Sequence, residues 1–272
     1  MKADPSNNPS RFSRNKELLK QLTVRNISES IRGSVLGVLW LIFNPLLNML
    51  LYVTVFGILF GGKFGNIENE NSINYAIGVY IGLTMVNLIN DTLSRSTHNL
   101  SVHSNLIRKV VFPVQLLPIS QVLGSSFKYL VNAVLWLAVG LFYGSVLRWE
   151  ILYLPLIILP MVVMSMGLAF LIGAVSVYFR DTQQLTSVLT QLVFWSSGVF
   201  FSAHKVMQAP EVWSVLKWNP VLLAIENIRA LALWGHAPSW NQVAFLYAAG
   251  LFSLGIGLFV FSRLRSGFAD FL

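Results

Sequence analysis

The first apolar stretch of this chain carries no charged side chain and reads VLGVLWLIFNPLLNMLLYVTVFGILF over positions 35–60. As a helix it would extend about 39 Å, because each residue adds roughly 1.5 Å. The hydrocarbon core of a bilayer is about 30 Å thick, so this length suits a tilted transmembrane helix. The stretch therefore predicts a membrane protein built from helices.

The composition of the whole chain points the same way. Of 272 residues, 55% are hydrophobic and 11% are charged, whereas soluble domains carry about 25% charged residues. The chain has no cysteine, which excludes disulfides and thiolate metal sites. Its four histidines, at positions 98, 103, 204 and 236, stand apart from any carboxylate cluster. We therefore expect no metal site and no catalytic site.

Five further apolar stretches follow the first. We expect transmembrane helices at about 75–93, 122–146, 152–178, 184–203 and 242–262. Six spans would place both termini on one side of the membrane. The fold class is thus an all-α integral membrane protein with about six spans, and the expected units are residues 1–33 and 34–272.

Lysine and arginine positions predict which side holds the termini. Thirteen of the 19 basic residues fall on the side of the termini, five fall on the other side, and Lys128 lies within a span. Basic residues accumulate on the cytoplasmic side, so the asymmetry places both termini there. The net charge of +8 accordingly reflects orientation in a bilayer, and we expect no nucleic-acid partner.

One short segment imitates a nucleotide-binding loop. The stretch GILFGGKF at 57–64 fits the spacing G-x-x-x-x-G-K, but Phe64 replaces the Ser or Thr that would hold Mg²⁺. The segment also lies at the outer end of the first expected span, away from cytoplasmic ATP. It is a chance match, and its glycines are better explained as the end of a helix.

Residues 15–33 predict an amphipathic helix. Leucines and isoleucines gather near one face, and Lys16, Lys20, Arg25 and Arg32 take the other. Such a basic helix suits the membrane surface, although an ordinary surface helix is the alternative.

A polar and aromatic stripe runs along the first span, where Trp40, Asn44, Asn48 and Tyr52 recur every four residues. This spacing keeps them on one slowly turning helix face. The stripe could border a polar conduit, or its amides could hydrogen-bond a neighbouring helix. Spacing alone leaves both interpretations open.

Three other features need a physical reason. Lys128 lies near the start of the third span. A charged residue within the membrane is a candidate for a functional role, but snorkelling of its ammonium to the headgroups is the favoured interpretation. Residues 94–112 predict a polar, then basic, cytoplasmic connection. Residues 204–241 predict an outer element in which Glu226 and Arg229 can pair at i, i+3, either re-entrant in the membrane or a soluble cap.

Four segments, taken in order, resemble the type-2 ABC export permeases for O-antigen, teichoic-acid and capsule-type polysaccharides. They are SIRGSVLGVLWLIFNPLLNML (30–50), NLIRKVVFPVQLLP (105–118), YFRDTQQLTSVLTQLVFWSSGVFF (178–201) and WNPVLLAIENIRALALWG (218–235). Each segment is weakly specific alone, but four in sequence are fairly specific.

The resemblance implies a subunit that exports lipid-linked polysaccharide across the bacterial cytoplasmic (inner) membrane. It implies a pair of permeases with two separate ATPase subunits, which would carry ATP and Mg, and no chemistry on this chain. The 15–33 helix would lie at the inner interface among membrane lipids. The 94–112 connection would become a coupling helix that docks on the ATPase.

The resemblance also assigns candidate site residues. The first and fifth spans would line the channel, which favours the conduit for the stripe, and aromatic rings would stack against sugars. The channel candidates are Trp40, Asn44, Asn48, Tyr52, Phe194, Trp195, Phe200 and Phe201. The ATPase-coupling candidates are Ser94, Arg95, His98, Asn105, Arg108, Lys109, Arg180 and Asp181.

Two other function classes stay open. A drug or antibiotic exporter of the same superfamily would share this architecture without a polymer conduit. A lipid-modifying membrane enzyme would need an acidic or histidine cluster near the membrane, and only Asp91 falls within or beside a span.

Overall fold

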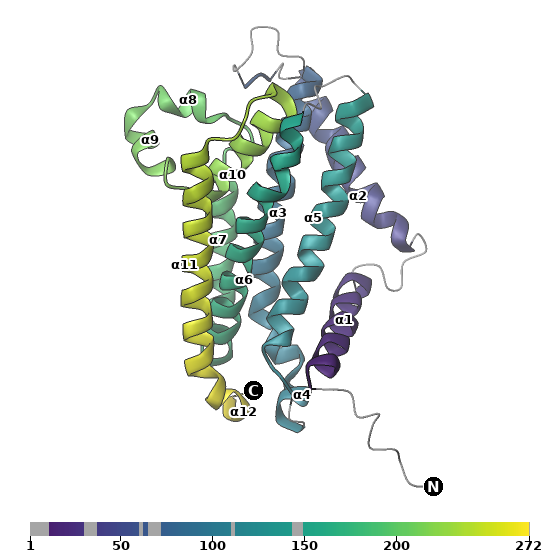
Figure 1. Cartoon of the computed structure of the whole chain (residues 1–272), viewed down its shortest axis with the longest axis vertical. Coiled ribbons are helices and arrows are strands. Elements are labelled where there is room, and N and C mark those ends of the chain that lie inside the picture. The colour runs from purple at the N-terminus through teal and green to yellow at the C-terminus, as the bar shows by residue number, and fades with distance from the viewer. Residues whose placement is uncertain are drawn as a thin grey trace.

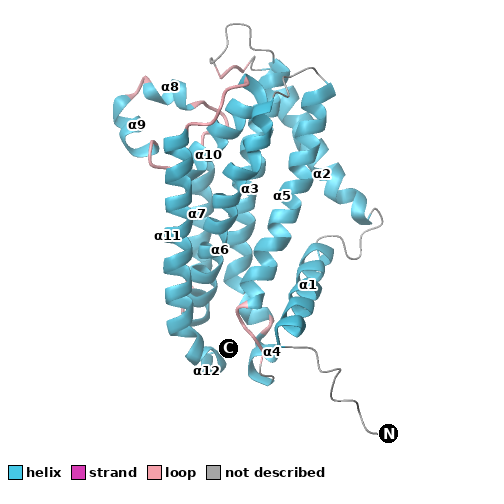
Figure 2. Ribbon diagram, in the orientation of Figure 1, coloured by secondary structure: helices cyan, strands magenta, loops and turns pink. Residues whose placement is uncertain are grey.

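The computed structural model describes residues 11–29, 37–59, 62–64, 72–109, 112–142 and 149–271, and the regular structure in these ranges is helical (Figure 2). Four helical segments are long and apolar enough to cross a membrane, and they stand side by side as a bundle (Figure 1). These segments are α3 (Ser72–Val102), α5 (Leu116–Phe142), η4 with α6 (Trp149–Tyr153 and Leu154–Tyr178), and α11 (Trp240–Leu264) with η6 (Arg265–Gly267). The expected all-α membrane fold is confirmed.

The first and fifth expected spans are shorter and less regular. The 35–60 stretch forms a 3-10 turn η2 (Gly37–Leu39), the helix α2 (Trp40–Tyr52) and a π-helical segment η3 (Val53–Leu59). The fifth is α7 (Thr182–Ser196), which stops before the expected 203. Gly198, at φ 70°, adopts the left-handed conformation that ends helices. The count of six spans therefore stays a prediction.

The central helix of the bundle is α3. Every residue from Tyr75 to Val86 is buried, and α3 packs against α5, α6 and α7. Its length exceeds the expected 75–93 because residues 94–102 continue the helix. Ser96 and Thr97 satisfy their hydroxyls on carbonyl oxygens of the same helix, at 2.6 and 2.8 Å.

The expected connection over 94–112 is helical in its first half, because residues 94–102 continue α3. The short helix α4 (Ser104–Lys109) follows α3 directly. The separate element at this end of the bundle is confined to α4 and the residues after it.

Helices α6 and α11 form the closest pair in the bundle. A methyl group added to Gly257 would lie 2.1 Å from the Gly167 carbonyl oxygen, and one on Gly167 would lie 2.3 Å from the Ser253 backbone. Small residues permit this approach, which provides van der Waals contact between membrane helices. Ser253 also donates to the Met164 carbonyl oxygen at 3.1 Å.

The N-terminal helix α1 (Arg11–Glu29) packs against α5. Asn26 Nδ2 donates to Ser120 Oγ at 3.1 Å, and Lys16 and Lys20 face outward. The start of α1, α4 and the C-terminal helix α12 (Phe268–Phe271) share one end of the bundle (Figure 1). Both ends of the described chain thus lie on the same side.

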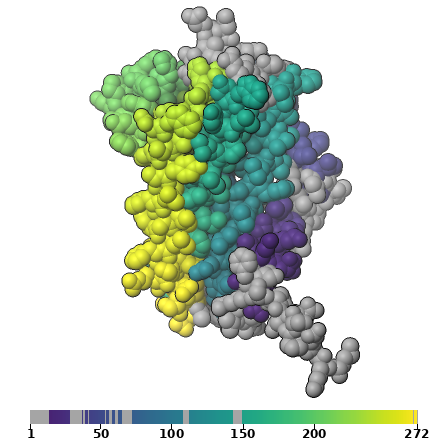
Figure 3. All heavy atoms as spheres, in the orientation of Figure 1, coloured from purple at the N-terminus to yellow at the C-terminus, as the bar shows by residue number. Residues whose placement is uncertain are grey.

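The opposite end carries the outer element. Helices α8 (Ala203–Met207) and α9 (Pro210–Leu216) form a lobe that projects beyond the bundle (Figure 3). The chain then returns as α10 (Pro220–Arg229) and η5 (Ala230–Trp234), whose apolar side chains are largely buried. This arrangement fits the expected re-entrant element.

Candidate functional site

A polar hollow of about 580 Å³ opens between α2, α3, α5 and the end of α7. Asn44, Asn48 and Tyr52 of the α2 stripe line it, together with Pro45 and, from α7, Phe194. Trp40, the fourth member of the stripe, does not. The rest of the lining is Tyr80, Leu83, Thr84, Asn87, Leu88, Asn90, Asp91, Ser94, Ser125, Lys128, Tyr129 and Asn132.

A proline inside α2 accounts for part of this geometry. Pro45 has no backbone N–H and crowds the preceding turn. In a bilayer, such a break is tolerated where the helix borders protein or a water-filled cavity. Asn44 and Asn48 are both exposed in the isolated chain, so their amides face an open side of the hollow.

An ion pair joins α3 and α5 on the wall of the hollow. Lys128 Nζ lies 3.5 Å from Asp91 Oδ2, and Ser125 Oγ donates to the same oxygen at 2.7 Å. Arg95 Nε donates to Asp91 Oδ1 at 2.7 Å. The ammonium of Lys128 therefore has a carboxylate partner that the sequence did not predict, and snorkelling of Lys128 to the headgroups stays a prediction.

A second network fixes the side chains above this pair. Tyr80 OH donates to Asn132 Oδ1 at 2.6 Å, and Asn132 Nδ2 donates to the Lys128 carbonyl oxygen at 2.6 Å. Each contact ties a lining residue to its neighbour. These hydrogen bonds join the Tyr80 hydroxyl of α3 to the Asn132 amide of α5.

The aromatic candidates lie where α2 meets the end of α7. Phe194 packs edge-on against Phe200 at 5.8 Å between centroids, and Tyr52 lies 6.4 Å from Phe200. Trp195 packs against Phe194 at 5.3 Å, yet 69% of it is exposed. The structure thus brings Tyr52, Phe194 and Phe200 together, whereas Trp195 points to the outside of the chain.

Phe201 contributes mainly through its backbone, because its carbonyl oxygen accepts from Arg229. Arg229 is fully buried and pairs with Glu226 at 2.9 Å, as the i, i+3 spacing predicted. It also donates to the carbonyl oxygens of Gly78, Gly198 and Val199, at 3.0, 2.8 and 2.7 Å. Sequence spacing could not identify these partners, which come from α3 and from the turn after α7.

The segment that imitates a P-loop is built differently. Residues 57–59 belong to η3. Phe64 is fully buried, and Cζ of Arg229 lies over the Phe64 ring, 4.2 Å from the ring centroid. The Lys63 carbonyl oxygen accepts from Lys205 Nζ at 2.6 Å. The described part of this segment therefore helps to anchor the outer element, and residues 60–61 of the motif lie outside the described ranges.

The coupling candidates fall into three groups. Ser94, Arg95 and His98 lie on α3, where Ser94 lines the polar hollow and Arg95 binds Asp91. Asn105 is exposed on α4, as are Arg180 and Asp181 at the turn between α6 and α7. Arg108 and Lys109 belong to α4, but their side chains lie outside the described part.

Sequence reasoning missed a polar clamp beneath the hollow. Gln121 Nε2 donates to the Thr92 carbonyl oxygen and to Ser96 Oγ, both at 2.9 Å. Asn99 Nδ2 donates to Gln121 Oε1 at 2.7 Å. The available signal for this link between helices was the polar Gln121, which precedes Ser125 and Lys128 in the first half of α5.

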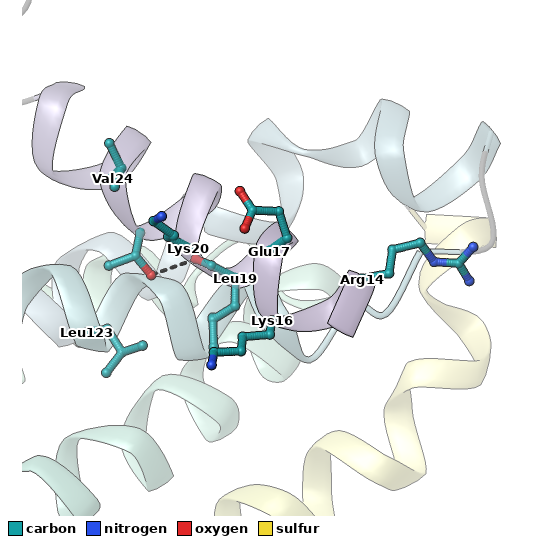
Figure 4. A pocket seen from close by; sticks show the side chains of 8 residues that line it. Arg14, Lys16, Glu17, Leu19, Lys20, Val24 and Leu123 are labelled. Carbon is teal, nitrogen blue, oxygen red and sulfur yellow. Dashed lines mark hydrogen bonds between the residues drawn. The ribbon is translucent and has the colours of Figure 1, made fainter. Parts of the chain in front are cut away.

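A second hollow, the basic groove, lies between α1 and α5 and measures about 810 Å³ (Figure 4). Its lining includes Arg14, Lys16, Lys20 and Glu17 from α1, with Leu123 from α5.

Within the described ranges, no cluster of three or more His, Asp or Glu residues could hold a metal ion.

Comparison with known proteins relates this arrangement to transporters. Residues 17–233 match the family model for the ABC-2 type transporter. The chain is 26% identical over 253 residues to the O-antigen export system permease protein RfbA of Myxococcus xanthus, covering 93% of this chain and 94% of that one.

Two further relatives are similar over nearly their whole length. A Klebsiella pneumoniae O-antigen export system permease protein RfbA is 24% identical and covers 94% of this chain and 95% of its own. The polysialic acid transport protein KpsM of Escherichia coli is 22% identical, with coverage of 91% and 93%.

Proposed function

The chain belongs to the ABC-2 type transporter family, and we propose that it is the permease subunit of an ATP-driven exporter of lipid-linked polysaccharide. One observation carries this proposal. Relatives that match over nine-tenths of the chain are named for O-antigen and polysialic acid transport. The polar hollow supports it further, because amides and aromatic rings suit a saccharide better than an apolar drug.

The energy for transport comes from a separate chain. We propose that two copies of this permease assemble with two ATPase subunits, which bind ATP and Mg. Helix α4, where Asn105 is exposed, and the α6–α7 turn with Arg180 and Asp181 are the surfaces for that partner. This permease catalyses no bond breaking, and its residues act by binding and positioning.

The path for the polymer follows the α2 stripe. Asn44, Asn48 and Tyr52 border the polar hollow with Phe194, and a two-fold pair of permeases would present this surface twice. Rings and amides offer a sugar many weak contacts. Weak contacts suit stepwise movement, because a deep binding well would hold each sugar in place.

The lipid-linked end of the polymer requires a different surface. The basic groove carries Arg14, Lys16 and Lys20 beside the apolar flank of α5. Clustered cations beside apolar surface suit anionic lipid headgroups at a membrane interface. We propose that this groove faces the inner leaflet of the cytoplasmic membrane, with both termini in the cytoplasm.

Deletion of the gene in its native cell tests the proposal. Export should stop, so surface polysaccharide disappears while lipid-linked polymer accumulates inside, and a plasmid copy should restore both. Normal surface polysaccharide with raised sensitivity to drugs would instead identify a drug exporter.

A further inference from the structure

The lining of the polar hollow is rich in side chains that form hydrogen bonds, which a mere gap in the packing of helices would not require. Its walls carry five asparagines and three tyrosines, drawn from three helices. They are Asn44, Asn48, Asn87, Asn90, Asn132, Tyr52, Tyr80 and Tyr129. An amide both donates and accepts hydrogen bonds, as does a phenol, so the lining is matched to a partner that does the same.

The charged groups at the hollow bind one another. The lining holds one carboxylate and one ammonium, Asp91 and Lys128, and they pair with each other. Both carboxylate oxygens of Asp91 already accept hydrogen bonds, from Arg95 and from Ser125. A free cation or a phosphate would need a set of opposite charges, so the lining favours a neutral ligand.

Two atoms of the lining lack hydrogen-bond partners in the described part of the chain. They are the hydroxyl of Tyr129 and Oδ1 of Asn90. Tyr129 is only 3% exposed, and buried polar groups nearly always have a partner. Each atom is itself buried, so a ligand reaches it only when the side chain turns toward the hollow that the residue lines; a hydroxyl-bearing ligand would then supply the partner.

Size and shape agree with this partner. The volume of about 580 Å³ lies within the roughly 300–1,000 Å³ typical of small-molecule sites. Tyr52 and Phe194 add aromatic surface to one side. We infer that the polar hollow binds a neutral saccharide unit within each permease, beside the polymer path, with Tyr129 and Asn90 as direct contacts. The inference rests on the proposed function and adds the place and residues of recognition.

The sharpest test removes one unpartnered hydroxyl. Tyr129→Phe deletes only an oxygen that has no partner in the fold, so the folded protein should lose no stability. Ser126→Ala is the matched control, because Ser126 Oγ on the same helix also lacks a partner but does not line the hollow. Asn87→Ala, at an exposed lining position, is the second variant.

The binding measurement uses the complete permease–ATPase complex in lipid nanodiscs. The probe is the repeating-unit oligosaccharide released from the cell's own surface polysaccharide, titrated by calorimetry. Tyr129→Phe and Asn87→Ala should each raise Kd about five- to tenfold, the scale of one hydrogen bond. Ser126→Ala should leave Kd unchanged.

Three outcomes would overturn the inference. Unchanged Kd in both lining variants would place the saccharide elsewhere. An equal effect of Ser126→Ala would indicate a structural role. Displacement of the oligosaccharide by millimolar inorganic phosphate would identify an anion site.

Failure of this inference is distinguishable from failure of the proposed function. If the complex exports polysaccharide in cells while the lining variants bind and export normally, the inference alone fails. If deletion of the gene leaves surface polysaccharide intact, the proposed function fails as well.

Discussion

Arg229 Nη2 donates a 2.7 Å hydrogen bond to the carbonyl oxygen of Val199, and this contact joins α10 to the turn that ends α7. Four carbonyl oxygens and the Glu226 carboxylate share this one guanidinium. The C-terminal end of a helix carries partial negative charge, so a buried cation there stabilises the break between α7 and the outer element.

We predict that Arg229→Leu lowers the free energy of unfolding by about 3–5 kcal/mol, because it leaves the partly buried Glu226 carboxylate and several carbonyl groups without their partner. Arg229→Lys should rescue little, since one ammonium cannot replace a planar guanidinium with five donors. Thermal unfolding of the purified protein measures both. Arg263→Leu, on the exposed face of α11, is the control and should unfold like the parent.

Local parts of this arrangement could be predicted from sequence, and the long-range parts could not. The Glu226–Arg229 pair follows from helical spacing. The partners Gly78 and Gly198 come from distant segments, and nothing in the periodicity of α10 identifies them. Asp91 and Lys128 are likewise 37 positions apart, so their pairing depends on which helices are neighbours.

The candidate site divides in the same way. The four-residue spacing of α2 correctly predicted that Asn44, Asn48 and Tyr52 share a face, and the structure shows that this face meets a polar hollow. Of the α3 and α5 residues of that hollow, Asp91, Ser94 and Lys128 were noted for other reasons, whereas Asn87, Asn90 and Asn132 were missed, because no helical spacing within the sequence connects α3 with α5. The length of α3 was underestimated, since its polar end is satisfied by hydrogen bonds within the helix.

One methyl group added at Gly257 should push α6 and α11 apart. In Gly257→Ala the new carbon would lie 2.1 Å from the Gly167 carbonyl oxygen, which forces the helices apart. Overpacking of this kind costs about 1–3 kcal/mol, so the folded fraction in size-exclusion chromatography should fall. Gly255→Ala, where a methyl group meets nothing within 4 Å, should behave as the parent. An equal folded fraction for the two variants would contradict the close packing of α6 against α11 at Gly257.

Membrane orientation can be read from single cysteines, because the chain contains none of its own. Ser72 begins α3 at the end of the bundle that carries α8 and α9, and Ser104 begins α4 at the other end. With the termini in the cytoplasm, Ser72→Cys in intact cells should react with an impermeant thiol reagent, and Ser104→Cys should react only after lysis. The reverse pattern would invert the proposed topology.

Charge reversal on α4 should uncouple the permease from its ATPase. Arg108 and Lys109 end this short helix, at the same end of the bundle as α1 and α12. Replacing both with Glu should reduce recovery of the ATPase with tagged permease, or remove its stimulation, because an electrostatic contact becomes repulsive. Reversal of Lys205, which lies on the outer element, should leave assembly intact. Full stimulation of the ATPase by the α4 variant would argue against docking there.

The α2 amides allow the conduit to be separated from structural hydrogen bonding. The side-chain amides of Asn44 and Asn48 form no hydrogen bond with another described residue, and both side chains are exposed. Asn227 provides the contrast, because its buried amide donates to the Leu223 carbonyl oxygen at 2.7 Å and to Gln242 Oε1 at 2.6 Å. Its Oδ1 also accepts from the Ser239 backbone N–H at 2.9 Å.

Asn44→Leu and Asn48→Leu should therefore assemble normally and stimulate ATP hydrolysis, while polysaccharide export falls. Asn227→Leu should instead lose stability by about 0.6 kcal/mol or more, the scale of a hydrogen bond between membrane helices, and its export should fall only with the amount of folded protein. Cysteines at 44 and 48 should react with small aqueous thiol reagents during transport, since the conduit is wet. Normal export by well-folded Leu variants, together with unreactive cysteines at both positions, would place the polymer path elsewhere.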